Sequence, residues 1–316
     1  MHPLHQGRQG DEGRLTPSPR SRVSLPSTER LHPRSGDLHV RSALEVVRRL
    51  HAEDLRAVRA AGRALGRIAR AAELAARALA SGGRLIWVGA GTSGRLGALD
   101  AAECPPTFGT RPWQVVAVVA GGTRALRASV EGAEDDPEDG AARVRRLRVD
   151  RRDLVCGISA SGRTPFVLGA LAEARRRGAR TALICCSDRP PRSPSVELAI
   201  AIPTGPELIA GSTRLKAGTA TKLALNAIST AAMVRLGKVF RGRMTSLQPT
   251  NEKLRRRALR TVAALTGATL ARSRRLLAGA GNRVDVAVAM ALTGRPAREA
   301  DLLLRGRGLR GVERLR

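Results

Sequence analysis

The chain has 316 residues, of which 42% are hydrophobic, enough for one large domain or two smaller ones with a buried core. No apolar run is as long as a membrane span, so we expect a cytoplasmic protein with no membrane partner. The formal charge of +29 suggests nucleic acid, but the chain has two Trp, three Phe and no Tyr for base stacking. We therefore attribute the charge to Arg-rich compositional drift and expect no specific nucleic-acid partner.

The N-terminal part of the chain is predicted to be an extension followed by helices. Residues 1–25 are polar, rich in Arg, His and Pro, and lack the apolar segment of a signal peptide, so we expect a disordered extension. Residues 41–80 carry apolar side chains at helical spacing, and the Ser-Gly-Gly at 81–83 is a stop signal.

The middle of the chain alternates between short apolar runs and helix-like segments. The expected strands are 84–90, 114–122, 153–160, 181–187 and 196–204. Continuous apolar strands separated by helices predict an α/β fold with a parallel sheet covered on both faces.

The last third of the chain is predicted to be helical. From about residue 214 the strand pattern stops, and residues 251–316 form a series of short helices broken by Gly. We expect a main domain over 26–245 and a small helical C-terminal subdomain over 246–316, which is either separate or a dimerisation element.

The first predicted strand ends in a literal G-x-G-x-x-G made by Gly89, Gly91 and Gly94. A dinucleotide site also needs an acidic residue at the end of the next strand, and none is found there. Thr92 and Ser93 instead place hydroxyls beside the N–H groups of a helix N-terminus, which favours a compact anion site.

The third predicted strand runs into a second loop of the same kind, with Ser159, Ser161 and Thr164. Two such loops at the carboxyl ends of parallel strands would face each other where open α/β sheets bind ligands. We interpret the pair as a sugar-phosphate cradle. For either loop alone, hydroxyls that merely cap a helix remain an alternative.

Five segments together resemble the sugar isomerase (SIS) domain proteins and, within them, the N-acetylmuramic acid 6-phosphate etherases. They are the stretches 89–110, 120–136, 157–171, 205–226 and 236–258, and the resemblance covers about residues 24–316. It implies a homodimer in cell-wall amino-sugar recycling, with a small-molecule sugar phosphate as substrate and no cofactor or metal.

The resemblance implies a lyase that cleaves the D-lactyl ether of N-acetylmuramic acid 6-phosphate into N-acetylglucosamine 6-phosphate and D-lactate. Ring opening makes C2 acidic, lactate leaves C3 by elimination, and water adds back. The route needs a base, an acid and stabilisation of enolate charge.

Carboxylates must carry the proton transfers, because all five His lie at or before position 51 and Tyr is absent. Glu103 lies beside Pro105 and Pro106 in an apolar, small-residue setting, and the resemblance assigns it as the acid/base group. Six acids crowd into 131–139, a run that is usually a solvated turn. Only the resemblance selects Glu134 as the second active-site glutamate.

Secondary candidates follow the fifth predicted strand, where they would contact the sugar or the lactyl carboxylate, or cap the next helix. They are Glu207, Ser212, Thr213 and Lys216. The N-terminal segment departs from the family pattern at His32, where Asn is expected, and at His39, where an acid is common.

Three other functions share parts of this pattern. A sugar-phosphate sensor of the glucokinase regulatory protein type would have the same hydroxyl loops without the paired glutamates. A transcriptional regulator would need a compact helix-turn-helix unit before the sheet. A sugar-phosphate isomerase would share proton removal at C2 but leave C3 untouched.

Overall fold

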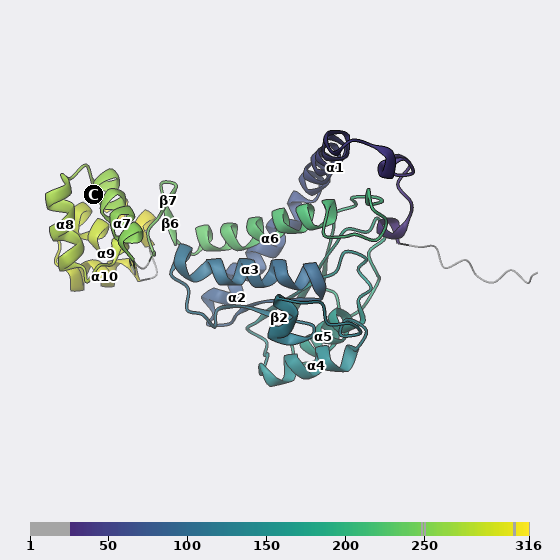
Figure 1. Cartoon of the computed structure of the whole chain (residues 1–316). Helices are drawn as coiled ribbons and strands as arrows, with labels where there is room; N and C mark the ends of the chain where they lie inside the picture. Colours follow the sequence, from purple (N-terminus) through teal and green to yellow (C-terminus); the bar gives the residue numbers. More distant parts are fainter. Residues whose placement is uncertain (1–25, 248, 250, 306–307, 316) are drawn as a thin grey trace, which may run out of the picture.

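The computed structural model describes residues 26–247, 249, 251–305 and 308–315. The predicted N-terminal extension, 1–25, lies outside the described residues. The chain forms a sheet covered by helices, and a group of short C-terminal helices lies to one side of it (Figure 1).

The sheet contains five parallel strands, as the sequence predicts. They are β1 (Leu85–Gly89), β2 (Val115–Val119), β3 (Leu154–Ile158), β4 (Arg180–Cys185) and β5 (Leu198–Ala201). Their order is β2-β1-β3-β4-β5, and Gly89 at the end of β1 pairs with Val119 on one side and Ile158 on the other.

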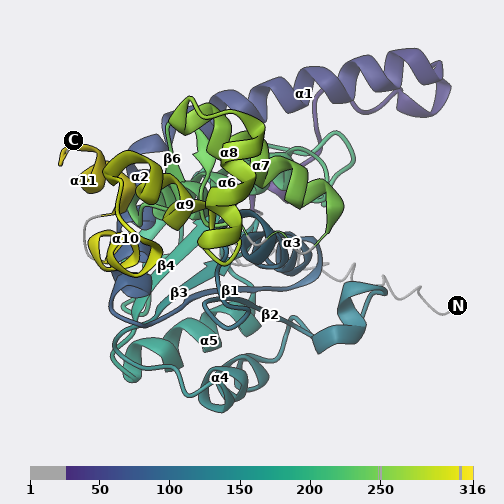
Figure 2. The same ribbon diagram turned by 90° about the vertical axis from the view of Figure 1, so that its left-hand side faces the viewer.

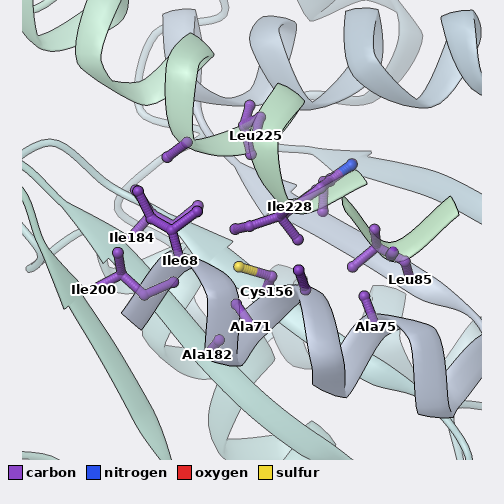
Figure 3. Close-up of a cluster of buried hydrophobic side chains, with 14 of the residues drawn as sticks. Ile68, Ala71, Ala75, Leu85, Cys156, Ala182, Ile184, Ile200, Leu225 and Ile228 are labelled. Carbon is purple, nitrogen blue, oxygen red and sulfur yellow. The ribbon is translucent and has the colours of Figure 1, made fainter. Parts of the chain in front are cut away.

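Helices cover both faces of the sheet (Figure 2), and alternate side chains of the inner strands enter two different cores. Leu85 and Trp87 pack toward α2 (Leu65–Ala80), α3 (Gly91–Phe108) and α6 (Lys216–Arg235). Ile86 and Val88 pack toward α4 (Pro137–Arg146) and α5 (Pro165–Arg176). Figure 3 shows side chains of α2, the strands and α6 meeting in the first core. The sheet is thus covered on both faces, as its apolar strands predict.

The N-terminal helical region, predicted over 41–80, consists of two helices. α1 (Ala43–Arg63) begins with a capping box at Ser42, and the helix breaks at Ala64 before α2 starts. The buried face of α1 carries Ala57 and Ala60, whereas its larger apolar side chains, such as Val47 and Val58, are exposed in this single chain.

The C-terminal region corrects one prediction, that no strand follows residue 214. A two-stranded hairpin is formed by β6 (Val239–Phe240) and β7 (Arg243–Met244), and short helices follow it. These are α7 (Glu252–Thr266), α8 (Leu270–Gly279), α9 (Val284–Thr293), α10 (Ala297–Leu304) and α11 (Gly308–Glu313). They share a core of their own with hairpin residue Phe240.

In the part of the chain that the structure describes, no single helix is both long enough and apolar enough to cross a membrane. Only α8 and α9 taken together, with a bend of 110° between them, have the length and composition of a span.

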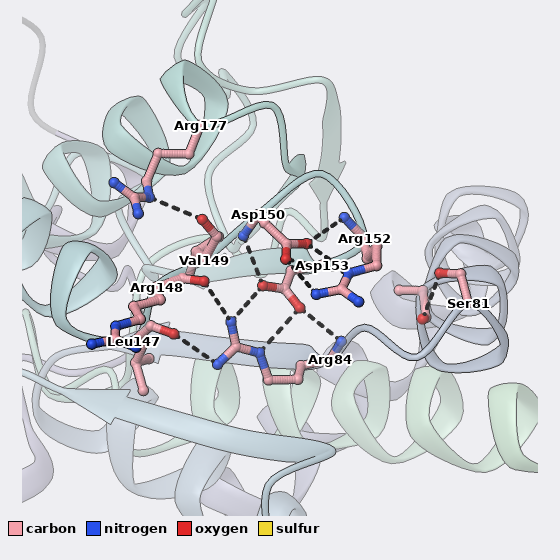
Figure 4. A network of polar contacts seen from close by, with 10 residues as sticks. Ser81, Arg84, Leu147, Arg148, Val149, Asp150, Arg152, Asp153 and Arg177 are labelled. Carbon is pink, nitrogen blue, oxygen red and sulfur yellow. Dashed lines mark hydrogen bonds and ion pairs between the residues drawn. The ribbon is translucent and has the colours of Figure 1, made fainter.

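The amino ends of β1 and β3 are joined by a polar network (Figure 4). Arg84 bonds to both carboxylate oxygens of buried Asp153, at 3.1 and 2.6 Å, and to the carbonyl of Leu147 at 2.9 Å. The Asp153 side chain also accepts the N–H groups of Arg84 and Asp150. This network stabilises the edge of the sheet opposite the one at which the two hydroxyl loops emerge.

Candidate functional site

The two hydroxyl loops leave adjacent strands in opposite directions. From β1 the chain continues into α3 on one face of the sheet, and from β3 it continues into α5 on the other face. Parallel strands whose connections diverge in this way leave a crevice at their carboxyl ends, where ligands of open α/β sheets bind.

Glycines bring the start of α3 against the end of β1. A Cβ on Gly89 would lie 2.7 Å from the Gly94 nitrogen, and a Cβ on Gly94 would lie 2.6 Å from the Gly89 oxygen. Gly91 has a φ of +52°, which favours glycine. No side chain caps α3, so its first N–H groups are available to a ligand beside Thr92 and Ser93.

A hydroxyl network shapes the second loop. The buried Ser159 hydroxyl lies 2.8 Å from that of Thr164 and also accepts the Thr164 N–H. The Ser161 hydroxyl accepts the N–H of Arg163 at 3.1 Å. Ser159 therefore supports the loop from behind, while Ser161 and Thr164 reach its open side.

Both loops line one cavity of about 330 Å3, a size that suits a small ligand. Its polar lining consists of Thr92, Ser93, Ser161, Thr164 and Thr213, with Glu29, Glu134, Asp135 and Arg163 as the charged residues. Of the six predicted phosphate-binding residues, Gly94 and Ser159 do not line it. A larger hollow of about 1060 Å3 beside residues 188–194 is lined neither by the start of α3 nor by any of these hydroxyl residues.

Glu134 reaches the cavity from the acidic run before α4. Its backbone carbonyl accepts the N–H of Phe166 at 3.0 Å, which ties the acidic loop to the first turn of α5. The neighbouring Glu131, in contrast, is not among the lining residues. The structure therefore separates Glu131 from Glu134, whereas Asp135 lines the cavity together with Glu134.

Glu103 lies away from this cavity. It is exposed on α3, about 16 Å along the helix from Thr92 at 1.5 Å per residue. The helix continues through Pro105 and Pro106 and ends at Gly109, and the exposed Glu103 does not have the apolar setting that the sequence suggests. Within one chain the two predicted catalytic glutamates are therefore not brought together.

The secondary candidates divide into one lining residue and a supporting group. Thr213 lines the cavity and Ser212 does not. The buried Glu207 carboxylate accepts the N–H groups of Lys216 and Ala217, so it caps α6, and burial raises its pKa. The Lys216 ammonium is buried and lies 2.6 Å from Glu53 on α1.

Sequence reasoning missed Glu29 and Arg163, which also line the cavity. Glu29 comes from a short 3-10 turn, η1 (Ser27–Glu29), about 60 residues before the first loop. Glu29 belongs to the Thr-Glu pair of the segment that resembles the family's N-terminal pattern, but the sequence gives it no role in the site. Arg163 lies two residues after Ser161 and is the cationic residue of the lining.

Cysteine and metal chemistry add nothing to this site. All four Cys are free and buried, and burial raises the pKa of Cys104 and of Cys186 to about 12. Among the described residues, no group of three or more His, Cys, Asp or Glu is placed to hold a metal ion.

Comparisons with known proteins match most of the chain. The model of the glucokinase regulatory protein N-terminal SIS domain matches residues 67–175, and that of the SIS domain matches 136–231. An N-acetylmuramic acid 6-phosphate etherase from Cutibacterium acnes is 48% identical over 89% of this chain and 92% of its own. One from Gloeobacter violaceus is 50% identical over 83% of this chain and 86% of its own.

A solved structure of a phosphoheptose isomerase from Neisseria gonorrhoeae is 21% identical, with a TM-score of 0.45, over 60% of this chain and 98% of its own.

Proposed function

The chain belongs to the N-acetylmuramic acid 6-phosphate etherase family, and from that premise we propose that the cavity between β1 and β3 holds the substrate of this enzyme. The activity is that of a carbon–oxygen lyase that cleaves an ether of N-acetylmuramic acid 6-phosphate. The regulator alternative is set aside because relatives that match most of the chain at 43–50% identity are named N-acetylmuramic acid 6-phosphate etherase.

The phosphate of the substrate binds at the two helix N-termini. The first N–H groups of α3, the hydroxyls of Thr92, Ser93, Ser161 and Thr164, and the Arg163 guanidinium offer hydrogen-bond donors and positive charge to the cavity. A phosphate dianion repels carboxylates, so the sugar rather than the phosphate lies beside Glu29, Glu134 and Asp135. The lining of one cavity by both hydroxyl loops and by Glu134 is the observation that supports the site most directly.

The reaction is an elimination followed by hydration. Once the ring opens, a carboxylate removes the C2 proton, the electron pair forms a C2–C3 double bond, and the C3–O bond breaks. The lactyl oxygen takes a proton and leaves as D-lactate, and water then adds its hydroxyl to C3 and its proton to C2. Glu103 and Glu134 are the pair that carries these proton transfers.

The site is complete only in a homodimer. Glu103 lies about 16 Å along α3 from the phosphate loop, too far to act on a sugar held in the cavity of its own chain. Glu103 of the partner subunit supplies the missing carboxylate. A second copy would also cover Val47 and Val58 on α1, which are 59% and 48% exposed in one chain. The enzyme works in the cytoplasm, in recycling of cell-wall amino sugars.

Lactate release in deuterated water tests the reaction. The purified protein is incubated with N-acetylmuramic acid 6-phosphate, D-lactate is assayed, and the amino-sugar product is analysed by mass and NMR. We expect release of D-lactate and an N-acetylglucosamine 6-phosphate that carries one deuterium fixed at its C2, because solvent protonates that sugar carbon when water adds back.

A variant of the cavity lining and a matched control test the role of the acidic run. Glu134→Gln should be inactive, whereas Glu131→Gln, in the same acidic run but outside the cavity lining, should retain activity. Saturable binding of the substrate without lactate release by the wild-type protein would contradict the proposed reaction.

A further inference from the structure

We infer that Glu29 is a further substrate-binding residue, whose carboxylate accepts hydrogen bonds from the sugar hydroxyls opposite the phosphate loops. The inference rests on the proposed function in so far as the cavity holds a sugar phosphate. It adds an N-terminal residue to a site otherwise built from the loops at the sheet edge.

Backbone contacts hold Glu29 at the rim of the cavity. The carbonyl of its neighbour Thr28, which is fully buried, accepts the N–H of Gly211 at 3.1 Å. Gly211 has a φ of +76°, and a Cβ there would lie 2.9 Å from the Glu29 Oε2. The glycine therefore provides both the turn and the space in which the carboxylate lies against the chain next to Thr213.

The carboxylate of Glu29 has no hydrogen bond or ion pair with any other residue of the described chain, although it faces a cavity rich in donors. An ionised carboxylate can only accept hydrogen bonds. A phosphate would repel it, whereas the hydroxyls of a sugar can each donate a hydrogen bond to it, and bonds to a charged acceptor are the stronger kind. Glu29 and the phosphate loops thus match the two ends of a sugar phosphate.

A buried charged cluster holds the segment that carries Glu29 against α1 and the start of α6. His32 Nε2 lies 3.2 Å from Glu53 Oε1, and the Lys216 ammonium lies 2.6 Å from Glu53 Oε2. All three residues are at most 5% exposed. Because His32 is only three residues beyond Glu29, this anchor limits where the carboxylate can move. A freely mobile terminal carboxylate would have no such constraint.

Binding measurements with Glu29→Gln test the inference without relying on turnover. Calorimetry compares N-acetylglucosamine 6-phosphate with inorganic phosphate, for the wild type and the variant. We expect the variant to bind the sugar phosphate about tenfold more weakly or worse, because a charged hydrogen bond is lost. Binding of inorganic phosphate should be unchanged or slightly tighter, since a nearby negative charge is removed.

Two controls accompany the variant. Glu73→Gln removes an exposed glutamate on α2, outside the cavity lining, and should bind both ligands like the wild type. Thr92→Ala should weaken the binding of both ligands, and this result would show that inorganic phosphate binds at the hydroxyl loops.

The possible outcomes separate this inference from the proposed function. If Glu29→Gln binds both ligands as the wild type does, or weakens both equally, the assignment of Glu29 to the sugar hydroxyls is overturned. Loss of sugar-phosphate binding alone supports it, even if the wild type releases no lactate. Release of lactate together with unchanged binding by Glu29→Gln leaves the enzyme function intact and removes Glu29 from the site.

Discussion

At the scale of single residues, the neutral imidazole of His32 links the N-terminal segment to Glu53 in the buried charged cluster. Its Nδ1 accepts the backbone N–H of Arg34 at 3.1 Å, so the ring proton lies on Nε2, which donates to Glu53. Burial lowers the pKa of His32 below 6.5, and the charges of Lys216 and Arg34 lower it further, although Glu53 opposes the shift. The residue that departs from the family pattern therefore satisfies both of its ring nitrogens here.

The lowered pKa of His32 predicts a loss of stability in mild acid. The unfolded chain takes up a proton near pH 6.5, whereas folded His32 resists it to a lower pH. The free energy of unfolding should thus fall as the pH drops below about 6.5, by at most about 1.4 kcal/mol per pH unit from this group. Urea unfolding between pH 7.5 and 5 measures this slope.

Replacing the imidazole should remove that part of the slope. His32→Asn is expected to make the unfolding free energy less dependent on pH over this window, while His39→Asn, at an exposed position, should leave the dependence unchanged. Equal slopes in His32→Asn and the wild type would show that His32 does not titrate as its surroundings require.

The sequence predicts some residues of the cavity lining and not others, for physical reasons. Thr92, Ser93, Ser161 and Thr164 were predicted because hydroxyls beside a strand end and a helix start form a local pattern, and all four line the cavity. Glu29 was not predicted because its position depends on contacts with Gly211, far along the chain.

At the scale of elements, α1 shows why helical spacing does not identify the buried face. Its apolar periodicity was predicted, yet the face packed on α6 is made of small residues such as Ala57 and Ala60, which allow a close approach. Val47 and Val58 lie outside that contact. A spacing pattern indicates that two faces exist, but the packing partner decides which one is covered.

Charged substitutions on this α1 face should break the homodimer. Val47→Glu with Val58→Glu would put two charges where a second copy would bury apolar area, and we expect sedimentation velocity to show a shift from dimer to monomer. The fold should persist, since both side chains are already half exposed in one chain.

A matched change beside Val58 provides the control. Arg59→Glu introduces the same residue about 100° around the helix and should leave the dimer in place. A double valine variant that remains dimeric, with unchanged activity, would exclude this face of α1 from the subunit contact.

On the scale of the whole molecule, the sheet, its two covered faces and the meeting of the hydroxyl loops follow from the strand pattern. The helical core of α7–α11 supports a further proposal, that the chain divides near residue 245 into a main domain and a C-terminal subdomain. The spacing of Thr92 and Glu103 already sets about 16 Å between them along a helix, but the sequence does not give the distance between Glu103 and the cavity of another subunit.

The measurement that tests shared sites most directly is lactate release by mixed dimers. Glu103→Gln and Glu134→Gln proteins are each assayed alone, then unfolded together in equal amounts, refolded and assayed again. If each cavity combines its own Glu134 with Glu103 of the partner subunit, half of the dimers are mixed and each has one intact site. We expect two inactive proteins to yield about one quarter of the wild-type activity. A refolded, dimeric mixture with no activity would contradict the shared site.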